Sequence, residues 1–108
     1  MTDLNKLAES FKEVSELRNK QNNWDYDTVK YLKHCAGEVV EAAEAFIVYK
    51  QENGVSVKEW AEHRKNFASE LADIVACVLI VAAREGVNME EALTSCLEKN
   101  RKRTENKQ

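Results

Sequence analysis

The sequence contains no proline and only three glycines, Gly37, Gly54 and Gly86. Proline and glycine are the residues that most often interrupt helices and form tight turns. Their scarcity favours a few long helices over a sheet. A chain of 108 residues is long enough for one domain with a single core, so we expect one domain over residues 1–108.

Several other features are missing as well. The three cysteines form no Cys-x-x-Cys pair, which indicates reduced thiols and a cytoplasmic location. The polar N-terminus has no signal-peptide pattern. The longest charge-free run, Ile74 to Ala83, is about half the length that spans a bilayer. The net charge of -3 gives no electrostatic reason to expect nucleic acid or an anionic membrane as a partner.

Apolar residues at helical spacing predict the first two helices. A first helix contains Leu4, Leu7, Phe11, Val14 and Leu17, and the polar stretch 19–23 ends it. Asp25 or Asp27 caps the second helix, and the stretch 51–54 closes it with Gly54 as the C-terminal glycine. The core face of this second helix is predicted to consist of Val29, Leu32, Ala36, Val39, Val40, Ala43, Phe46 and Ile47.

Capping signals predict two further helices. Ser56 followed by Glu59 forms a capping box, so a third helix begins there and runs to Arg84 or Glu85 before Gly86. Asn88 followed by Glu91 starts a fourth helix. Its apolar stripe is predicted to be Met89, Ala92, Leu93, Cys96 and Leu97. We expect residues 99–108 to fray and the end from about 104 to be disordered, which gives an all-α four-helix bundle.

The most informative stretch is the third helix from Ser69 to Ala83. After Asp73 it carries no charged residue until Arg84, so this part of the helix belongs in an apolar setting. Glu70 and Asp73 nevertheless lie at its entrance, on one face. Carboxylates against a core cost several kcal/mol unless a cation pairs with them.

The second helix carries a matching pair, Glu38 and Glu41. In an antiparallel hairpin that turns near Gly54, Glu38 lies level with Asp73, and Glu41 lies level with Glu70. Four carboxylates would then converge at one level and repel one another without cations. With Mg²⁺ or Mn²⁺ they would form an oxygen-rich metal site suited to phosphate chemistry.

The alternative is that both pairs are exposed stripes. The same spacing occurs in Glu13/Glu16 and Glu59/Glu62, which we interpret as solvated. A di-iron centre is disfavoured because it requires Glu-x-x-His on two helices. A zinc site made of His34, Cys35, Cys77 and Cys96 lacks ligand spacing, and cysteines on apolar stripes usually belong to a core.

The pairs Glu38-x-x-Glu41 and Glu70-x-x-Asp73, with 28 residues between them, resemble the signature of the all-α nucleoside triphosphate pyrophosphatases, the MazG-like superfamily. The sequence 99–103 is similar to the family's C-terminal Asn-x-x-Arg element. Trp24 is similar to the aromatic entry to its first metal-binding helix. One departure is Cys96, where many relatives carry lysine, and it puts the phosphate contact and the nucleotide preference in doubt.

The resemblance implies Mg²⁺-dependent cleavage between the α- and β-phosphates, giving a nucleoside monophosphate and pyrophosphate. It implies that the metal ligands and catalytic carboxylates are Glu38, Glu41, Glu70 and Asp73. Family members assemble as homodimers or homotetramers. The apolar belt from Ile74 to Ala83, more than one hairpin can cover, is also predicted to lie in a homo-oligomer interface.

Substrate contacts are predicted for the nucleoside and for the phosphates. Trp24 and Asn100 would contact the nucleoside, although Trp24 is equally suited to a hydrophobic staple. The phosphate contacts would come from Lys30, His34, Lys102 and Arg103. Lys30 and His34 also fit a role as i,i+4 surface partners of their own helix.

The sequence therefore predicts a nucleoside or deoxynucleoside triphosphate pyrophosphohydrolase. Two alternatives stay open. One is an enzyme resembling phosphoribosyl-ATP pyrophosphatase, and the other is a non-catalytic helical module that senses a nucleotide or a metal ion.

Overall fold

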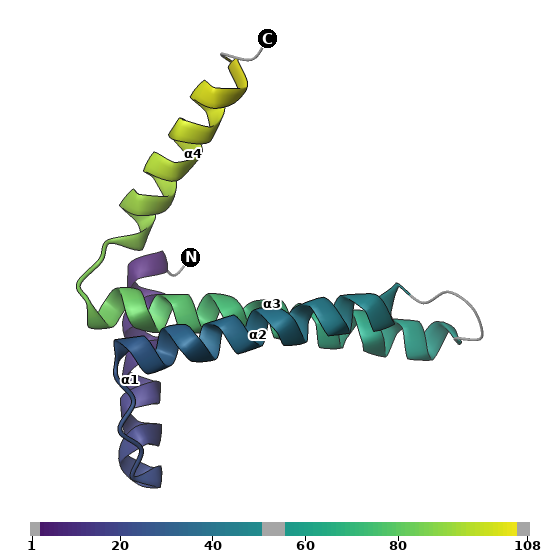
Figure 1. The fold of residues 1–108 in the computed structure, drawn as a ribbon, viewed down its shortest axis with the longest axis horizontal. Coiled ribbons are helices and arrows are strands. Elements are labelled where there is room, and N and C mark those ends of the chain that lie inside the picture. Colours follow the sequence, from purple (N-terminus) through teal and green to yellow (C-terminus); the bar gives the residue numbers. More distant parts are fainter. Residues whose placement is uncertain (1–2, 51–55, 106–108) are drawn as a thin grey trace. The chain divides into compact units, whose positions relative to one another are not determined.

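The computed structural model describes residues 3–50 and 56–105, which form four helices and no strand. The helices are α1 (Leu4–Asn22), α2 (Thr28–Tyr49), α3 (Val57–Arg84) and α4 (Met89–Glu105), as labelled in Figure 1. The predicted all-α fold with four helices is confirmed. The chain groups into two compact units, one spanning Asp25–Val78 and the other formed by the segments on either side of it.

Side-chain caps begin α1 and α2. The carboxylate of Asp3 accepts a hydrogen bond from the backbone N–H of Lys6, and Asp27 accepts one from Lys30, both at 2.9 Å. Asp27 rather than Asp25 is therefore the cap of α2. Asn23 ends α1 in the left-handed conformation at φ 55°, which asparagine tolerates better than most residues. The predicted closure of the second helix at 51–54, including Gly54, lies outside the described residues.

The predicted boundaries of α3 are confirmed. The hydroxyl of Ser56 accepts a hydrogen bond of 3.1 Å from the N–H of Glu59. At the other end Gly86 has φ +69°, a conformation that side-chain-bearing residues rarely adopt. The N–H groups of Gly86 and Val87 donate to the carbonyls of Ala83 and Ala82, which closes the helix with a Schellman motif.

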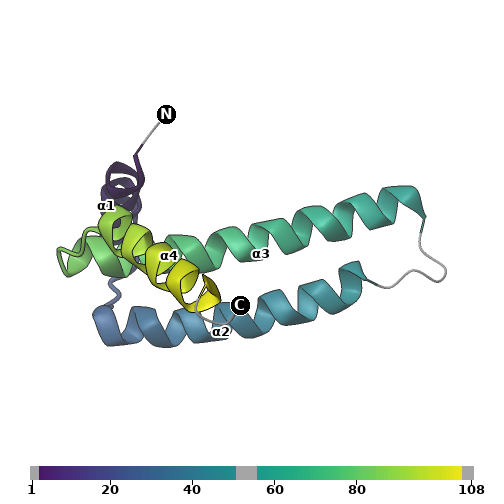
Figure 2. The same cartoon turned by 90° about the horizontal axis from the view of Figure 1, so that it is seen from above.

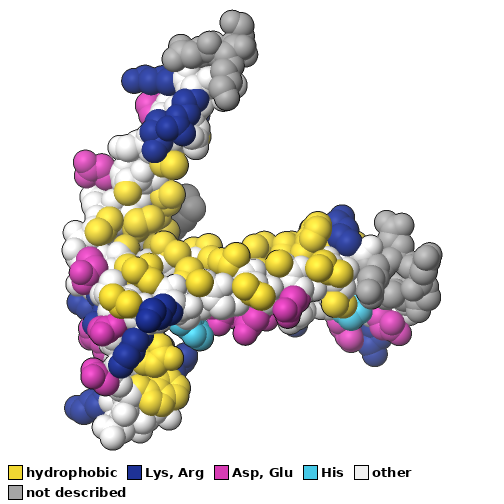
Figure 3. All heavy atoms as spheres, viewed as in Figure 1, with side chains coloured by type: hydrophobic (Ala, Val, Ile, Leu, Met, Phe, Trp, Pro, Cys, Tyr) yellow, Lys and Arg dark blue, Asp and Glu magenta, His cyan; other side chains and the backbone are white. Residues whose placement is uncertain are grey.

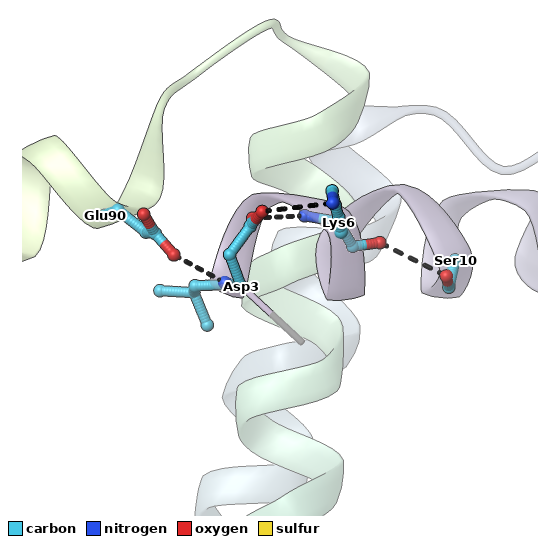
Figure 4. Close-up of polar contacts among 5 residues, drawn as sticks. Asp3, Lys6, Ser10 and Glu90 are labelled. Carbon is cyan, nitrogen blue, oxygen red and sulfur yellow. Dashed lines mark hydrogen bonds and ion pairs between the residues drawn. The ribbon is translucent and has the colours of Figure 1, made fainter. Parts of the chain in front are cut away.

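The start of α4 is tied to the start of α1 within one compact unit. The Asn88 side chain accepts hydrogen bonds from the N–H of Glu91 and from the amide of Asn5, at 3.1 and 2.8 Å. The backbone N–H of Leu4 donates to Glu90 at 2.6 Å, a contact drawn in Figure 4 beside the Asp3 cap. The N–H of Met89 in turn donates to the Asn5 side chain at 3.1 Å, so each helix supplies part of the other's N-terminal capping.

The expected fraying from residue 99 is wrong as far as residue 105, because α4 continues to Glu105. An ion pair of 3.8 Å joins Arg101 to Glu98, and the Thr104 hydroxyl donates to the carbonyl of Asn100. Lys102 and Arg103 in the last turn also complement the negative end of the helix dipole.

Helices α2 and α3 lie side by side and run in opposite directions, as Figures 1 and 2 both show. This is the predicted antiparallel hairpin. The more buried face of α2 is narrow and repeats at intervals of four and three residues; it consists of Tyr31, Cys35, Glu38, Ala42, Ala45 and Tyr49. The small side chains of Ala42 and Ala45 allow close helix approach. We call this stripe the inner seam.

The predicted core face of α2 is wrong for this chain by itself. All eight residues assigned to it are exposed, including Val39 at 50% and Ile47 at 63%. The cause is that α2 carries two apolar stripes, and a helix paired with one neighbour buries only one of them. Six of the eight repeat at intervals of three and four residues, as in a coiled-coil seam: Val29, Leu32, Ala36, Val39, Ala43 and Phe46. We call this exposed stripe the outer seam.

Aromatic side chains pack together where the C-terminal part of α2 meets the N-terminal half of α3. The rings of Tyr49 and Phe67 stack at 5.8 Å between centroids, and Trp60 packs against Tyr49 at 5.5 Å. Phe46 adds a contact of 5.3 Å with Phe67. The prediction that Trp60 serves packing agrees with these contacts.

Exposed apolar surface extends over the hairpin. Figure 3 shows hydrophobic side chains running along it on the face in view. On α3 the exposed ones include Leu71, Val75 and Val78. By length and composition alone α3 passes a simple test for a membrane-spanning helix, as core helices of soluble proteins also do, and only 22% of its most apolar window is buried. Exposed apolar surface of this extent is typical of a face that packs against another surface.

Candidate metal centre

The hairpin gathers carboxylates from both of its helices. One carboxylate oxygen from each of Glu38, Glu41 and Glu70 lies within 4.8 Å of the other two. Glu38 and Glu41 share a face of α2 because they are three residues apart, and α3 brings Glu70 to the same level. The structure therefore brings together three of the four carboxylates that the predicted hairpin register places at one level.

Asp73 lies at the margin of this group. It is exposed and is not among the carboxylates that meet within 4.8 Å. Its side chain is one methylene shorter than that of glutamate, so it reaches less far from α3. Its charge still acts on Glu38, because it contributes to raising the pKa of that carboxyl group.

Glu38 is the best enclosed member of the cluster, with a side chain that is 13% exposed. Burial is the main cause that raises its pKa above the ordinary value, and the charge of Glu41 adds to the effect. His34 opposes the shift, with its Nε2 at 3.0 Å from the Glu38 Oε1. The other oxygen, Oε2, is buried and has no hydrogen-bond partner.

Glu70 also has an unsatisfied acceptor, because its Oε2 is buried without a hydrogen-bond partner. A buried acceptor that lacks a donor costs about 1–3 kcal/mol, and more when the group is charged. Two such oxygens beside a third carboxylate are unfavourable unless a cation lies among them. The donor set consists only of oxygens, which fits a hard cation such as Mg²⁺ or Mn²⁺.

Two predicted phosphate contacts have partners within their own helix or its entrance. His34 pairs with Glu38, four residues later on α2. The ammonium group of Lys30 donates to the backbone carbonyl of Asp25 and so braces the start of the helix. The structure thus places His34 at the carboxylate cluster and Lys30 in the N-terminal turn of α2.

The remaining predicted substrate residues belong to the other compact unit. Trp24 is half exposed, and its backbone N–H donates to the carbonyl of Asn19 at the end of α1. On α4, the amide of Asn100 donates to the Cys96 sulfur at 3.8 Å. Lys102 and Arg103 are exposed and line an open depression on the same helix. Their roles toward substrate stay predictions.

The rest of the inner seam was not predicted from the sequence. Tyr31 is buried, its ring meets Tyr26 at 5.2 Å, and its backbone carbonyl accepts a hydrogen bond from the Cys77 thiol. The available signal was the spacing from Tyr31 through Cys35 to Glu38, which places these residues on one helical face. The outer seam is more hydrophobic than the inner seam, so it gave the stronger signal for a buried face.

Comparison with known proteins gives the family of the chain. Residues 25–107 match the family model described as the MazG nucleotide pyrophosphohydrolase domain. The chain is also 26% identical over 102 residues to the uncharacterized protein YvdC of Bacillus subtilis (strain 168), a match that covers 92% of this chain and 96% of that protein. No solved structure matches the chain. Because the family model covers most of the sequence, including every carboxylate of the cluster, the chain belongs to the MazG nucleotide pyrophosphohydrolase family.

Proposed function

We propose that this protein is a Mg²⁺-dependent pyrophosphohydrolase of nucleoside or deoxynucleoside triphosphates. The observation that carries the proposal is the meeting of Glu38, Glu41 and Glu70 within 4.8 Å, with buried and unpaired oxygens on two of them. A solvated acidic stripe would have neither feature. Membership of the MazG family supplies the reaction class.

In this proposal the metal ligands are Glu38, Glu41, Glu70 and Asp73. Mg²⁺, for which Mn²⁺ can substitute, would neutralise phosphate charge and lower the pKa of bound water. Glu41 and Asp73 are exposed, so the cluster is open on one side to a triphosphate. Glu38 and Glu70 are more buried and form the side of the cluster that lies between the two helices.

The carboxylates also supply the base. A carboxylate that is not fully engaged as a ligand orients a water molecule and accepts its proton. Water is then added across the linkage between the α- and β-phosphates, which breaks and releases pyrophosphate and a nucleoside monophosphate. His34 holds Glu38 in place through its bond to Oε1, which leaves the buried Oε2 without a hydrogen-bond partner and available to a cation.

The substrate contacts complete the proposal. Trp24 stacks on the base and Asn100 hydrogen-bonds to the nucleoside. Lys30, His34, Lys102 and Arg103 contact phosphates. Each of the three long basic side chains is exposed and can reorient toward an anion.

A second copy of the chain would cover the outer seam, giving a homodimer or a homotetramer. The seam has the three-and-four spacing that pairs helices, and it is exposed along the length of α2. Sedimentation at micromolar concentration tests this part of the proposal, and a monomer would contradict it. If the protein partitions into detergent micelles instead, a membrane is the covering.

The experiment that tests the activity measures pyrophosphate release from a panel of nucleoside and deoxynucleoside triphosphates, with phosphoribosyl-ATP included. Reactions contain Mg²⁺, Mn²⁺ or EDTA. Release is expected with either metal, and its loss is expected in EDTA and in Glu38→Gln and Asp73→Asn. Glu62→Gln, an exposed glutamate of another Glu-x-x-Glu pair on α3, is the matched control and should keep full activity.

Two results would replace the proposal. Turnover of phosphoribosyl-ATP alone would identify the related pyrophosphatase activity. Tight nucleotide binding without any turnover would indicate a sensor that keeps the acidic scaffold.

A further inference from the structure

Two cysteines face each other across the hairpin, outside the proposed ligand set. Cys35 lies on α2 and is half buried, while Cys77 lies on α3 and is 5% exposed. Cys35 is three residues before Glu38, and Cys77 is four residues after Asp73. In an antiparallel hairpin these offsets place both thiols at one level, about one helical turn from the carboxylates.

A direct contact fixes this placement. The Cys77 thiol donates a hydrogen bond of 3.1 Å to the backbone carbonyl of Tyr31. That carbonyl is the one that the N–H of Cys35 reaches in a regular α-helix, four residues on. Helical side chains lean toward the N-terminus, so the sulfur of Cys35 covers the turn that contains Tyr31. Cys77 therefore meets α2 at the place that the Cys35 side chain covers.

The electrostatics of the pair agree with this contact. The pKa of the Cys77 thiol is raised to about 11, mainly by burial, with further contributions from the charge and the hydrogen bond of Cys35. Cys77 is thus a protonated, protected thiol, and Cys35 is its more accessible neighbour.

We propose that Cys35 and Cys77 form an oxidation site, at which a peroxide converts the two thiols into an intramolecular disulfide that joins α2 to α3. The more accessible sulfur of Cys35 attacks hydrogen peroxide and the O–O bond breaks, so that one oxygen stays on the sulfur as a sulfenic acid and the other leaves as water. The sulfur of Cys77 then attacks it, the S–O bond breaks, and a second water is released. One peroxide molecule accepts two electrons, and each sulfur loses one. Thiol reductants reverse the reaction.

The third cysteine provides the contrast. Cys96 is exposed on α4, and its sulfur accepts a hydrogen bond from the Asn100 amide. It has no second thiol on its own helix. A peroxide should therefore oxidise Cys96 without linking it within the chain.

The test is mass mapping of the full-length protein after treatment with hydrogen peroxide, alkylation of the remaining thiols and digestion with trypsin. The three cysteines fall in different tryptic peptides, 34–50, 66–84 and 85–99. The proposal predicts a 34–50 peptide linked to a 66–84 peptide, recovered from the monomer band of a non-reducing gel. The link should be equally abundant in Cys96→Ser, absent from Cys35→Ser, and reversed by dithiothreitol.

Three results would overturn the proposal. They are conversion of Cys35 to sulfinic or sulfonic acid while Cys77 stays alkylatable, a link found only between two chains, and full retention of both thiols while Cys96 is oxidised. None of these readouts uses nucleotide turnover, so the outcome does not depend on the proposed hydrolase activity. The decisive measurement is the detection of the linked peptides in the wild-type protein. It therefore does not depend on whether the variants fold.

Discussion

Replacing Glu38 with glutamine should stabilise the metal-free protein. Glu38 shares the cluster with two other carboxylates, and one of its oxygens is buried without a partner. Glutamine has nearly the same size, removes one negative charge, and keeps an oxygen for the hydrogen bond with His34. The substitution therefore isolates the repulsion that a cation would otherwise neutralise.

The size of the effect follows from the distances. Two like charges 4.8 Å apart repel by about 1 kcal/mol with water-like screening and by about 3.5 kcal/mol at an effective dielectric constant of about 20. The pair with Glu41 belongs near the lower figure because Glu41 is exposed, and the pair with half-buried Glu70 lies between them. A net gain of about 2 kcal/mol, or a rise in Tm of roughly 5–15 °C, is expected for Glu38→Gln.

The gain should depend on pH. The pKa of Glu38 is raised in the folded state, so the folded protein holds this proton more tightly than the unfolded chain does. The corresponding stability is complete below the unfolded pKa of 4.5 and is lost as the pH rises through the raised value. Glu38→Gln removes this loss, so the gain should be largest at pH 8 and should shrink toward pH 4.

Thermal unfolding in EDTA at several pH values, repeated with Mg²⁺, measures both effects. Mg²⁺ should raise the Tm of the wild type and should have little effect on the Tm of Glu38→Gln. The difference in Tm between the two proteins should therefore shrink or change sign. Glu62→Gln should behave as the wild type does. A lower Tm for Glu38→Gln in EDTA at pH 8 would refute the reasoning, because it would mean that attraction within the chain, such as the contact with His34, outweighs the repulsion from the other carboxylates.

The other predictions concern the helix ends and the outer seam. Asn88→Ala removes the cap of α4 and the bond to Asn5, and should lower the free energy of unfolding by about 1–2 kcal/mol in urea titrations; an unchanged midpoint would contradict the cap. Gly86→Ala should cost about 1 kcal/mol by the same assay because of its positive φ, and a stabilised variant would show that the turn relaxes. If the outer seam forms the proposed homo-oligomer interface, Val39→Glu should give monomers in sedimentation, whereas Val57→Glu, at an exposed site off the seam, should leave the assembly unchanged.

Features that depend on a few neighbouring residues could be predicted from the sequence. Asp27, Ser56 and Asn88 cap helices where expected because a short polar side chain satisfies N–H groups only two or three residues away. Gly86 ends α3 for an equally local reason. The meeting of Glu41 with Glu70 could also be predicted, since the expected register of the hairpin places these two residues at one level.

Features that depend on the surface against which a helix packs could not be predicted from the sequence. The sequence shows two stripes on α2, and hydrophobicity favours the one with Leu32 and Val39. The structure turns the other toward α3, because Ala42 and Ala45 permit close approach there. Which stripe a helix buries depends on all the surfaces that surround it, including those of other chains. Asp73 lies at the margin of the cluster for a related reason, because register fixes its level and not the reach of its side chain.

The most direct test of the proposed reaction is a phosphorus NMR time course of a deoxynucleoside triphosphate with the protein and Mg²⁺. The account predicts that pyrophosphate and the monophosphate appear together in equal amounts, and that EDTA stops both. Orthophosphate with the diphosphate as the products, or an unchanged substrate spectrum under conditions in which the nucleotide is shown to bind, would contradict it.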